Sequence, residues 1–372
     1  MKKYNEQDVI RLARRINNTK RGYLIVDPLQ GKHIPVSPAL TCELASSLGK
    51  LLLERAADAK LIVGFAETAT ALGALAAINF PDDTVYLHTT RERLDSDSIV
   101  SFREEHSHAV DQIVECSYIQ SVKTPTVIMI DDEISTGRTI DNIVTQLRAA
   151  FPFLNETRFV IGSIINRMTD DIRERLLAKN IEFVSLLDID APDYEERTKD
   201  MSVTEAAAAE FRAAEYGTVS LKNRIPDLRL GITVGEMKEK MNKLSSELES
   251  AFSGESSGIK RLLVLGTEEC MTAAIYAGRY IESRYDGLSV FTHSTTRSPI
   301  GICTARDYPC KNGFVLPSFY EDGRKTHLYN IDDYDTMLVL TDSNNDEQVK
   351  KAMDSLSGVF HGHCNNIYLI RG

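Results

Sequence analysis

Short apolar runs alternate with amphipathic stretches along most of the chain. Strand-sized apolar runs occupy residues 22–27, 61–65, 85–88, 127–130, 159–165 and 183–187. Apolar side chains at helical spacing occupy residues 9–16, 42–57, 68–78, 139–150 and 171–179. Strands separated by helices form parallel sheets with both faces covered. The first part of the chain is therefore predicted to be a doubly wound α/β domain.

The pattern changes between residues 191 and 234. An Ala- and Glu-rich stretch over 203–214 predicts a helix, and a polar connection follows it. A second α/β series begins with a helix expected over 236–252. We place the boundary near residue 225, so that residues 1–225 form the first domain and residues 226–372 a second, smaller α/β domain.

Three sequence patterns of the first half return in the second half in the same order. VGFAETAT (63–70) is similar to LGTEECMT (265–272), and VYLHTTR (85–91) to VFTHSTTR (290–297). TVIMIDDE (126–133) is similar, more weakly, to TMLVLTDS (336–343). Because strand-loop-helix units often look alike, two interpretations stay open: a degenerate internal repeat, or a coincidence of local pattern.

Composition restricts the class of protein. The chain has 372 residues with 42% hydrophobic content, enough for two cores. Its apolar runs are much shorter than the roughly 20 residues that cross a bilayer, and its amino terminus is polar. Six cysteines without a CxxC pair suit a reducing compartment. We expect a cytoplasmic protein without a membrane partner, and the net charge of −11 argues against nucleic acid as a partner.

VIMIDDEISTGRT (127–139) places two acidic residues directly after an apolar strand. Asp131 and Asp132 would lie at the carboxyl edge of the sheet, where open α/β folds bind ligands. Adjacent carboxylates can accept hydrogen bonds from a cis-diol or hold water around Mg²⁺. The loop that follows turns its amides towards a helix N-terminus, as in a phosphate site, and consists of Ser135, Thr136, Gly137, Arg138 and Thr139. An acid pair beside a phosphate site matches ribose 5-phosphate.

This segment resembles the motif that binds phosphoribosyl pyrophosphate (PRPP) in type I phosphoribosyltransferases: four apolar residues, two acidic residues, a short spacer and Thr-Gly-x-Thr. The resemblance implies Mg²⁺-dependent transfer of ribose 5-phosphate from PRPP to a nitrogen acceptor. Asp131 and Asp132 would be catalytic and would reach the metal through PRPP or water. The family also has a pyrophosphate loop, which here would consist of Gly64, Phe65, Ala66, Glu67 and Thr68. Family members commonly form homodimers, so we expect one here.

Two further family features have candidates in the first half. A mobile loop would cover residues 89–109, where Arg91 and Arg103 are candidates to neutralise the departing pyrophosphate. A solvated surface loop is the alternative. A hood over the acceptor would include residues 21–38, with Lys32 and His33 as candidate contacts. A strand and turn that complete the sheet are the alternative there.

The second half contains STTRSPIG (294–301) and resembles the TRSP domain, named for its Thr-Arg-Ser-Pro motif. That domain follows phosphoribosyltransferases encoded in bacterial tellurite-resistance and stress-response gene clusters, which implies a role in making a nucleoside-like metabolite. The loop TDSNNDEQV (341–349) lacks Thr-Gly-x-Thr and should not bind PRPP. Candidate residues for a second site are Glu269, His293, Arg297 and Ser298. Pairing of Arg297 inside the domain is the alternative.

A phosphoribosyltransferase is thus the leading hypothesis. The alternative from another class is a regulator that binds PRPP or a nucleotide without turnover. A basic loop and a pyrophosphate loop favour turnover, because a sensor has no leaving group to stabilise. A second domain that acts on the product of the first also stays open.

Overall fold

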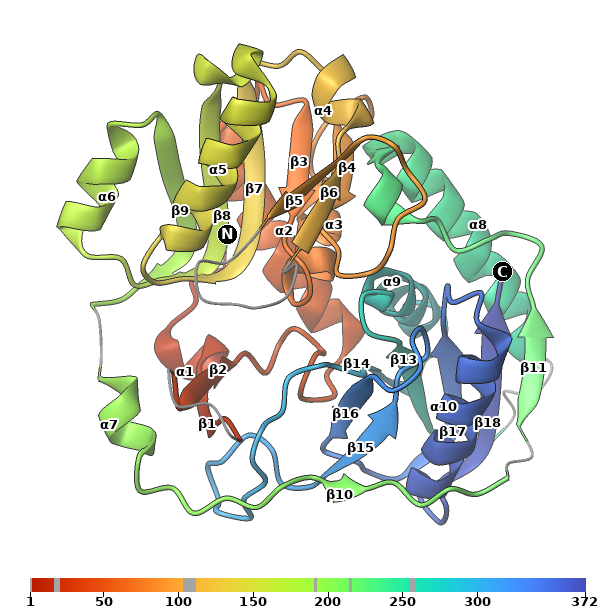
Figure 1. Cartoon of the computed structure of the whole chain (residues 1–372). Helices are drawn as coiled ribbons and strands as arrows, with labels where there is room; N and C mark the ends of the chain where they lie inside the picture. Colours follow the sequence, from red (N-terminus) through yellow and green to blue (C-terminus); the bar gives the residue numbers. More distant parts are fainter. Residues whose placement is uncertain (1, 17–20, 103–111, 191–192, 214–215, 254–257) are drawn as a thin grey trace. The chain divides into compact units, whose positions relative to one another are not determined.

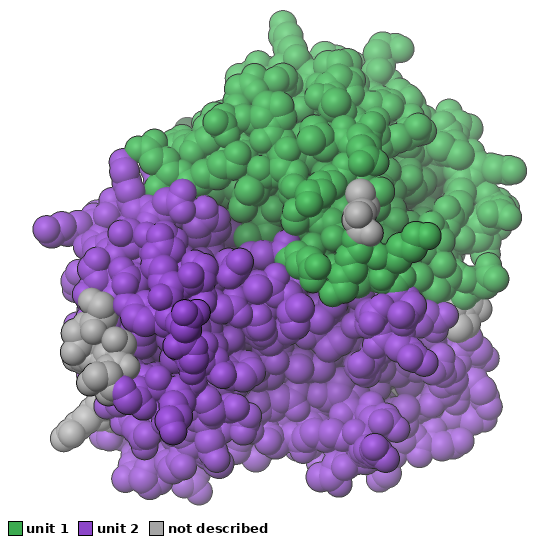
Figure 2. Space-filling model, turned by 180° about the vertical axis from the view of Figure 1, so that it is seen from behind, with its two compact units in different colours: residues 1–4, 43–192, 226–239 green, residues 5–42, 193–225, 240–372 purple. Residues whose placement is uncertain are grey.

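The computed structural model describes residues 2–16, 21–102, 112–190, 193–213, 216–253 and 258–372. The chain forms two compact units, coloured separately in Figure 2, and each is built from three stretches of sequence. Unit 1 comprises residues 1–4, 43–192 and 226–239, and unit 2 comprises residues 5–42, 193–225 and 240–372. These interleaved units are compact parts of the structure, and the boundary between two sequence domains near residue 225 stays a prediction.

Unit 1 is built on a six-stranded sheet in the order β12-β4-β3-β7-β8-β9. Figure 1 labels β4, β3, β7, β8 and β9 of this sheet. The strands are β3 (Leu61–Gly64), β4 (Val85–His88), β7 (Thr126–Ile134), β8 (Arg158–Asn166), β9 (Ile181–Asp188) and β12 (Ile232–Thr233). Five of them are parallel, and β12 pairs antiparallel with β4 at the edge. The predicted α/β class and parallel sheet are confirmed.

Helices cover both faces of this sheet. On one face, Val63, Met129 and Ile161 belong to a buried cluster with residues of α5 (Arg138–Ala150) and α6 (Asp170–Leu177). On the other face, Tyr86 donates its hydroxyl to a carbonyl of α3 (Ala69–Ala77), and Leu52 of α2 (Pro38–Arg55) packs at Gly162. Apolar runs without alternation are typical of strands buried on both faces, which is why the sequence predicts these strands well.

A hairpin lies between β4 and β7 in the sequence. Strand β5 (Ile99–Phe102) pairs antiparallel with β6 (Gln112–Glu115), and the short helix α4 (Ser117–Ser121) follows. The stretch 89–109, predicted as a polar loop, therefore contains a strand, because Val100 and Phe102 pack on the unit 1 core. Residues 103–111 lie outside the described part of the chain.

Unit 2 is built on a five-stranded parallel sheet in the order β11-β18-β17-β13-β14. Its strands are β11 (Gly217–Ser220), β13 (Arg261–Gly266), β14 (Ser289–Ser294), β17 (Tyr334–Leu340) and β18 (Cys364–Arg371). The helices are α8 (Val234–Ser253), which begins in unit 1, α9 (Met271–Glu282) and α10 (Asp346–Val359). A hairpin of β15 (Gly313–Pro317) and β16 (Lys325–Tyr329) precedes β17. Short elements elsewhere in the chain are α1 (Glu6–Val9), η1 (Pro152–Asn155), α7 (Tyr194–Thr198) and η2 (Leu228–Leu230).

Two predicted helices are wrong, and both lie in unit 2. The helix expected over 9–16 ends at Val9, and β1 (Arg11–Arg14) pairs antiparallel with β2 (Tyr23–Val26). The helix expected over 203–214 is absent from residues 203–213, where β10 (Ala207–Ala208) pairs in parallel with β15. In both places hydrogen bonding to a distant strand outweighs local helix propensity.

The two sheets share a strand order. In unit 1 the order β4-β3-β7-β8 corresponds to β14-β13-β17-β18 in unit 2. Each unit also has an antiparallel hairpin at the same place in the chain. In unit 1 the hairpin β5/β6 lies between β4 and β7, and in unit 2 the hairpin β15/β16 lies between β14 and β17. The matched sequence patterns fall on matched strands. The internal repeat stays a hypothesis, and this shared topology favours it.

No helix within the described residues is both long and apolar enough to cross a membrane.

Candidate active site

Strand β7 extends beyond its neighbour β3 and carries the acid pair on the extension. Its pairing with β3 ends at Gly64 and Ile130, whereas its pairing with β8 continues to Ile134 and Asn166. The strand predicted to stop at Ile130 is therefore longer, because β8 supports four more residues. Asp131 and Asp132 lie on this one-sided extension, and both are half-buried.

Asp131 and Asp132 interact directly. The amide of Asp132 donates to the carboxylate of Asp131 at 2.9 Å. Burial raises the pKa of Asp131 well above its usual range, and the neighbouring charge of Asp132, followed by that of Glu133, raises it further. Three acidic side chains in succession thus create a strongly negative position that favours either a proton or a cation.

A buried ion pair neutralises the third acid. The guanidinium of Arg167 binds the carboxylate of Glu133, with 2.9 Å between Nε and Oε1. The side chains of Arg167 and Glu133 are only 6% and 11% exposed. Sequence reasoning missed Arg167, although its place directly after β8 brings it to the same sheet edge as the acid pair.

The loop after β7 has the features of a phosphate site. Gly137 has φ 64°, and a Cβ there would lie 2.6 Å from Cδ1 of Leu176, so both backbone and packing require glycine. Helix α5 starts directly afterwards at Arg138; its N-cap residue Gly137 has no side chain, and the amide of Arg138 donates to Oγ1 of Thr136 at 3.4 Å. Thr136, Arg138 and Thr139 are exposed. The first-turn amides of α5 are thus at the surface, where the helix dipole favours an anion.

The predicted pyrophosphate loop, residues 64–68, connects β3 to α3. Two of its amides bind inside the protein: that of Phe65 donates to the carbonyl of Ile130 at 2.9 Å, and that of Ala66 donates to Oγ1 of Thr89 at 2.8 Å. The Ala66 amide thus has a partner inside the protein, and its contact with pyrophosphate stays a prediction. The next amides along the loop are those of Glu67 and Thr68, at the N-terminus of α3, which has no side-chain cap.

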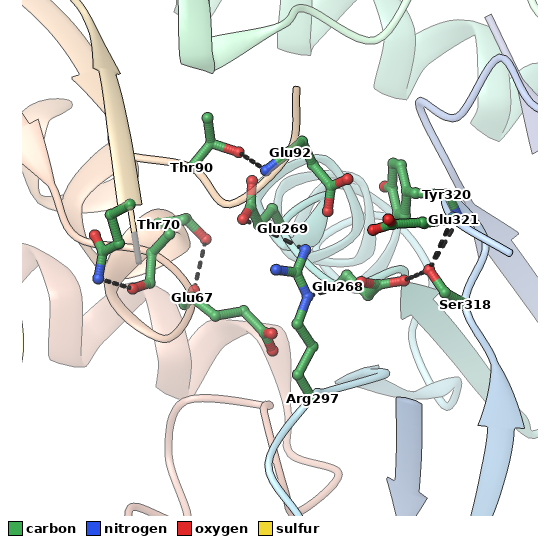
Figure 3. A network of polar contacts seen from close by, with 12 residues as sticks. Glu67, Thr70, Thr90, Glu92, Glu268, Glu269, Arg297, Ser318, Tyr320 and Glu321 are labelled. Carbon is green, nitrogen blue, oxygen red and sulfur yellow. Dashed lines mark hydrogen bonds and ion pairs between the residues drawn. The ribbon is translucent and has the colours of Figure 1, made fainter. Parts of the chain in front are cut away.

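Packing inside unit 1 also requires glycine at position 64. A Cβ on this residue would lie 2.5 Å from the hydroxyl of Tyr86 and 2.9 Å from the carbonyl of Ala69. The close approach is thus to the protein's own strand and helix. Within the loop, Oγ1 of Thr70 donates to the carbonyl of Glu67 at 3.1 Å (Figure 3).

Of the two arginines predicted to neutralise the departing pyrophosphate, only Arg91 lies within the described residues. Arg91 is exposed and follows Thr90, whose hydroxyl accepts the amide of Glu92 at 2.9 Å (Figure 3). Arg103 lies outside the described residues. Arg91 therefore stays a candidate from its position after β4.

The predicted hood residues belong to unit 2 and are buried there. Lys32 is 1% exposed, and its ammonium lies 3.5 Å from the carbonyl of Glu268. The carbonyl of His33 accepts the side-chain amide of Asn330 at 2.8 Å. Both residues thus help to hold the segment before α2 in unit 2, and acceptor recognition stays a prediction for them.

Glu268 is the centre of the polar network in unit 2 (Figure 3). Its buried carboxylate accepts the hydroxyl of Ser318 at 2.6 Å and pairs with Arg297 at 2.9 Å and Arg324 at 3.2 Å. Arg297 also lies 3.7 Å from the carboxylate of Glu269. Arg297 therefore pairs within the unit, as the alternative interpretation of this residue predicts, and Glu268 is the partner that sequence reasoning missed.

His293 and Ser298 make main-chain contacts in unit 2. The Nε2 of His293 lies 2.7 Å from the carbonyl of Tyr329, and Nδ1 lies 3.4 Å from that of Gly31. Burial lowers the pKa of His293 to about 4, so the ring is neutral at physiological pH. The carbonyl of Ser298 accepts the hydroxyl of Tyr329 at 2.7 Å. The role of both residues in a second site stays a prediction.

The donor set at β7 fits a metal brought by a substrate. Within the described ranges, no group of three or more His, Cys, Asp or Glu side chains is placed to hold an ion. Asp131 and Asp132 offer hard oxygen atoms, and Mg²⁺ often binds proteins through one or two carboxylates while substrate phosphates and water supply the rest.

Comparison with protein families agrees with the site. Residues 9–190 match the family described as phosphoribosyl transferase. This chain is therefore an enzyme of the phosphoribosyltransferase class. More particularly, it carries a second domain, because residues 228–356 match the family described as the TRSP domain C-terminal to that transferase. The predicted resemblance is confirmed in both halves.

Three solved structures with partial similarity bear the names of phosphoribosyltransferases. Adenine phosphoribosyl transferase from Trypanosoma brucei, in complex with AMP, pyrophosphate and ribose-5-phosphate, is 20% identical over 39% of this chain and 64% of its own length, with a TM-score of 0.29. Orotate phosphoribosyltransferase from Aeropyrum pernix is 16% identical over 51% of this chain and 94% of its own, with a TM-score of 0.32. The adenine enzyme from Giardia lamblia is 16% identical over 48% and 93%, with a TM-score of 0.36. No curated protein matches the chain.

Proposed function

We propose that unit 1 transfers ribose 5-phosphate from PRPP to a nitrogen atom of a nucleobase-like acceptor and releases pyrophosphate, with Mg²⁺ as cofactor. The observation that carries this proposal is the acid pair on the one-sided end of β7, followed six residues later by the N-terminus of α5 at the glycine turn. One position suits the ribose hydroxyls and the other suits the 5-phosphate.

Each part of the chain has a defined task in this reaction. Asp131 and Asp132 accept hydrogen bonds from the 2- and 3-hydroxyls and orient the sugar. The first turn of α5 holds the 5-phosphate. These two contacts fix the ribose while the bond from C1 to pyrophosphate breaks, so positioning supplies much of the catalysis.

The leaving group needs positive potential, because its charge grows as the bond breaks. The N-terminus of α3, with the amides of Glu67 and Thr68, supplies partial positive charge, and Arg91 supplies a full one. Mg²⁺, when bound with PRPP, neutralises pyrophosphate oxygens. No side chain forms a covalent bond to the sugar.

The acceptor is proposed only by class. A nitrogen nucleophile must approach C1 from the face opposite the pyrophosphate. Lys32 and His33 stay predicted contacts for its carbonyl or acidic groups from the sequence alone. The TRSP domain favours a role in the synthesis of a nucleoside-like metabolite.

Pyrophosphate release tests the proposal. The full chain is incubated with PRPP and Mg²⁺ and with a panel of purines, pyrimidines and small nitrogenous acids, and released pyrophosphate is measured. The double variant Asp131→Asn/Asp132→Asn should lose at least about a hundredfold in rate if both carboxylates orient the sugar. Removal of Mg²⁺ with a chelator should abolish release.

A second acidic pair offers a matched control. Asp170 and Asp171 are exposed at the start of α6, so Asp170→Asn/Asp171→Asn makes the same change in charge away from β7. It should keep the wild-type rate. Release that depends on one acceptor and disappears only in the first double variant supports the transferase. Tight PRPP binding without release from any acceptor contradicts the proposed turnover and favours the regulator.

A further inference from the structure

Three residues of unit 1 form a closed ring of hydrogen bonds. The amide of Ala66 donates to Oγ1 of Thr89 at 2.8 Å. The hydroxyl of Thr89 donates to Oε1 of Gln112, and Nε2 of Gln112 donates back to the carbonyl of Ala66 at 3.0 Å. The ring joins the loop after β3, the end of β4 and the start of β6.

The direction of the three bonds is fixed by chemistry. Because the amide of Ala66 can only donate, the oxygen of Thr89 accepts that bond and its hydroxyl hydrogen is donated to Gln112. A rotated Gln112 amide would place its oxygen against the carbonyl of Ala66, where two acceptors repel. All three residues are buried, at 7%, 0% and 8% exposure for Ala66, Thr89 and Gln112. The ring therefore determines the orientation of the backbone at Ala66.

The corresponding loop of unit 2 keeps the threonine and lacks the glutamine. There the amide of Glu268 donates to Oγ1 of Thr295 at 2.9 Å, as Ala66 does to Thr89. Main-chain bonds join Thr296 to His327, as they join Thr90 to Ile113.

The residue before Ile113 is Gln112, whereas the residue before His327 is Thr326. The hydroxyl of Thr326 lies 3.4 Å from carbonyls of its own hairpin, those of Leu316 and Pro317. A loop of this kind therefore folds without the glutamine. Gln112 occurs in the unit that also has the acid pair and Thr-Gly-Arg-Thr.

We propose that Gln112 is a positioning residue of the pyrophosphate site. It holds both sides of Ala66, the amide through Thr89 and the carbonyl directly, so that the following amides of Glu67 and Thr68 point to the leaving group. This inference rests on the proposed function of unit 1. It predicts that Gln112 affects binding of the pyrophosphate part of PRPP and not binding of its ribose 5-phosphate part.

Two ligands separate these parts. Ribose 5-phosphate needs the acid pair and the first turn of α5, whereas pyrophosphate needs the loop after β3. Calorimetric titration of the full chain in the presence of Mg²⁺ measures the affinities for ribose 5-phosphate, pyrophosphate and PRPP. It requires no acceptor. Gln112→Met keeps the size of the side chain and removes both hydrogen bonds.

The variant should bind pyrophosphate and PRPP about tenfold more weakly, as expected for loss of oriented buried hydrogen bonds, and should bind ribose 5-phosphate as the wild type does. Thr89→Val should reproduce this result and Thr89→Ser should restore wild-type binding. Gln120→Met, the same change at an exposed residue of α4, should alter none of the three affinities.

Equal weakening of all three ligands in Gln112→Met would overturn the positioning role, because it indicates general loss of structure. Unchanged pyrophosphate and PRPP binding would also overturn it, while the proposed function would stand. If the wild type binds neither PRPP nor pyrophosphate with Mg²⁺, the proposed function fails and this inference fails with it.

Discussion

Arg167 binds the buried carboxylate of Glu133 at the end of the sheet, directly beyond the acid pair of β7. The ion pair cancels one of three adjacent negative charges at the end of β7. A main-chain hydrogen bond beside this ion pair joins the end of β7 to the end of β8: the amide of Arg167 donates to the carbonyl of Ile134 at 2.8 Å.

Removal of Arg167 alone should be strongly destabilising. Arg167→Met removes the guanidinium that pairs with the carboxylate of Glu133, and we expect the free energy of unfolding to fall by about 3 kcal/mol. Urea denaturation at pH 7 measures this change. The double variant Arg167→Met/Glu133→Gln should recover most of the loss. A double variant as unstable as the single one would show that packing, rather than charge, is the cause.

Asp131→Asn should stabilise the protein while abolishing activity. The pKa of Asp131 is raised on folding, so the folded state binds more protons than the unfolded chain, and stability falls as pH rises from about 3.8, the usual pKa, towards the folded pKa. Asparagine has no such penalty.

The stability advantage of Asp131→Asn should therefore grow with pH above 4 and level off once the pH passes the folded pKa. Urea denaturation in the absence of Mg²⁺ over a pH series measures it. Asp171→Asn at the exposed start of α6 is the control. An advantage that does not change with pH would mean that the carboxyl is not strained by burial and by its neighbours.

Gly137→Ala should weaken both the fold and the phosphate site. The residue has φ 64°, and the added methyl would meet Leu176, so we expect a loss of about 2 kcal/mol in unfolding free energy and weaker binding of ribose 5-phosphate. Gly287→Ala is a matched control, because Gly287 has φ 83° with no atom within 4 Å of the added methyl. It should lose about 1 kcal/mol and keep ligand binding. Equal binding by both variants would contradict the role of Gly137.

Glu268→Gln should destabilise unit 2. The change leaves Arg297 and Arg324 beside each other without their shared carboxylate, and we expect a loss of about 3 kcal/mol. Urea denaturation followed by fluorescence of the tyrosines measures it. Glu321→Gln removes an exposed partner of Arg324 and should cost less than about 1 kcal/mol. Similar losses in both variants would contradict the central place of Glu268.

The central strands of both sheets carry a local signal, because each is a short apolar run buried on two faces. Val63 and Met129 in unit 1 and Leu263 and Val339 in unit 2 illustrate this local signal. The acid pair and Gly137 could be predicted because strand end, loop and helix start are consecutive in sequence. A motif of this kind needs no knowledge of distant residues.

Other parts depend on residues far away in the sequence. Residues 207–208 are alanines with high helix propensity, and only their pairing with β15 makes them a strand. Arg167 and Gln112 lie 34 and 46 residues from Glu133 and Ala66, the partners that give them a role. No local pattern identifies such contacts, whereas the sheet topology does.

The interleaved course of the chain has a consequence for its synthesis. Residues 5–42 belong to unit 2, whose largest segment, residues 240–372, leaves the ribosome last, and unit 1 lacks its edge strand β12 until residue 233 has been made. The amino-terminal segment must therefore wait for most of translation before it meets its partners, and long-range pairing of this kind folds slowly. A gene cut at residue 225 would separate segments of both units, so we expect neither half to be soluble when expressed alone and both to assemble when expressed together.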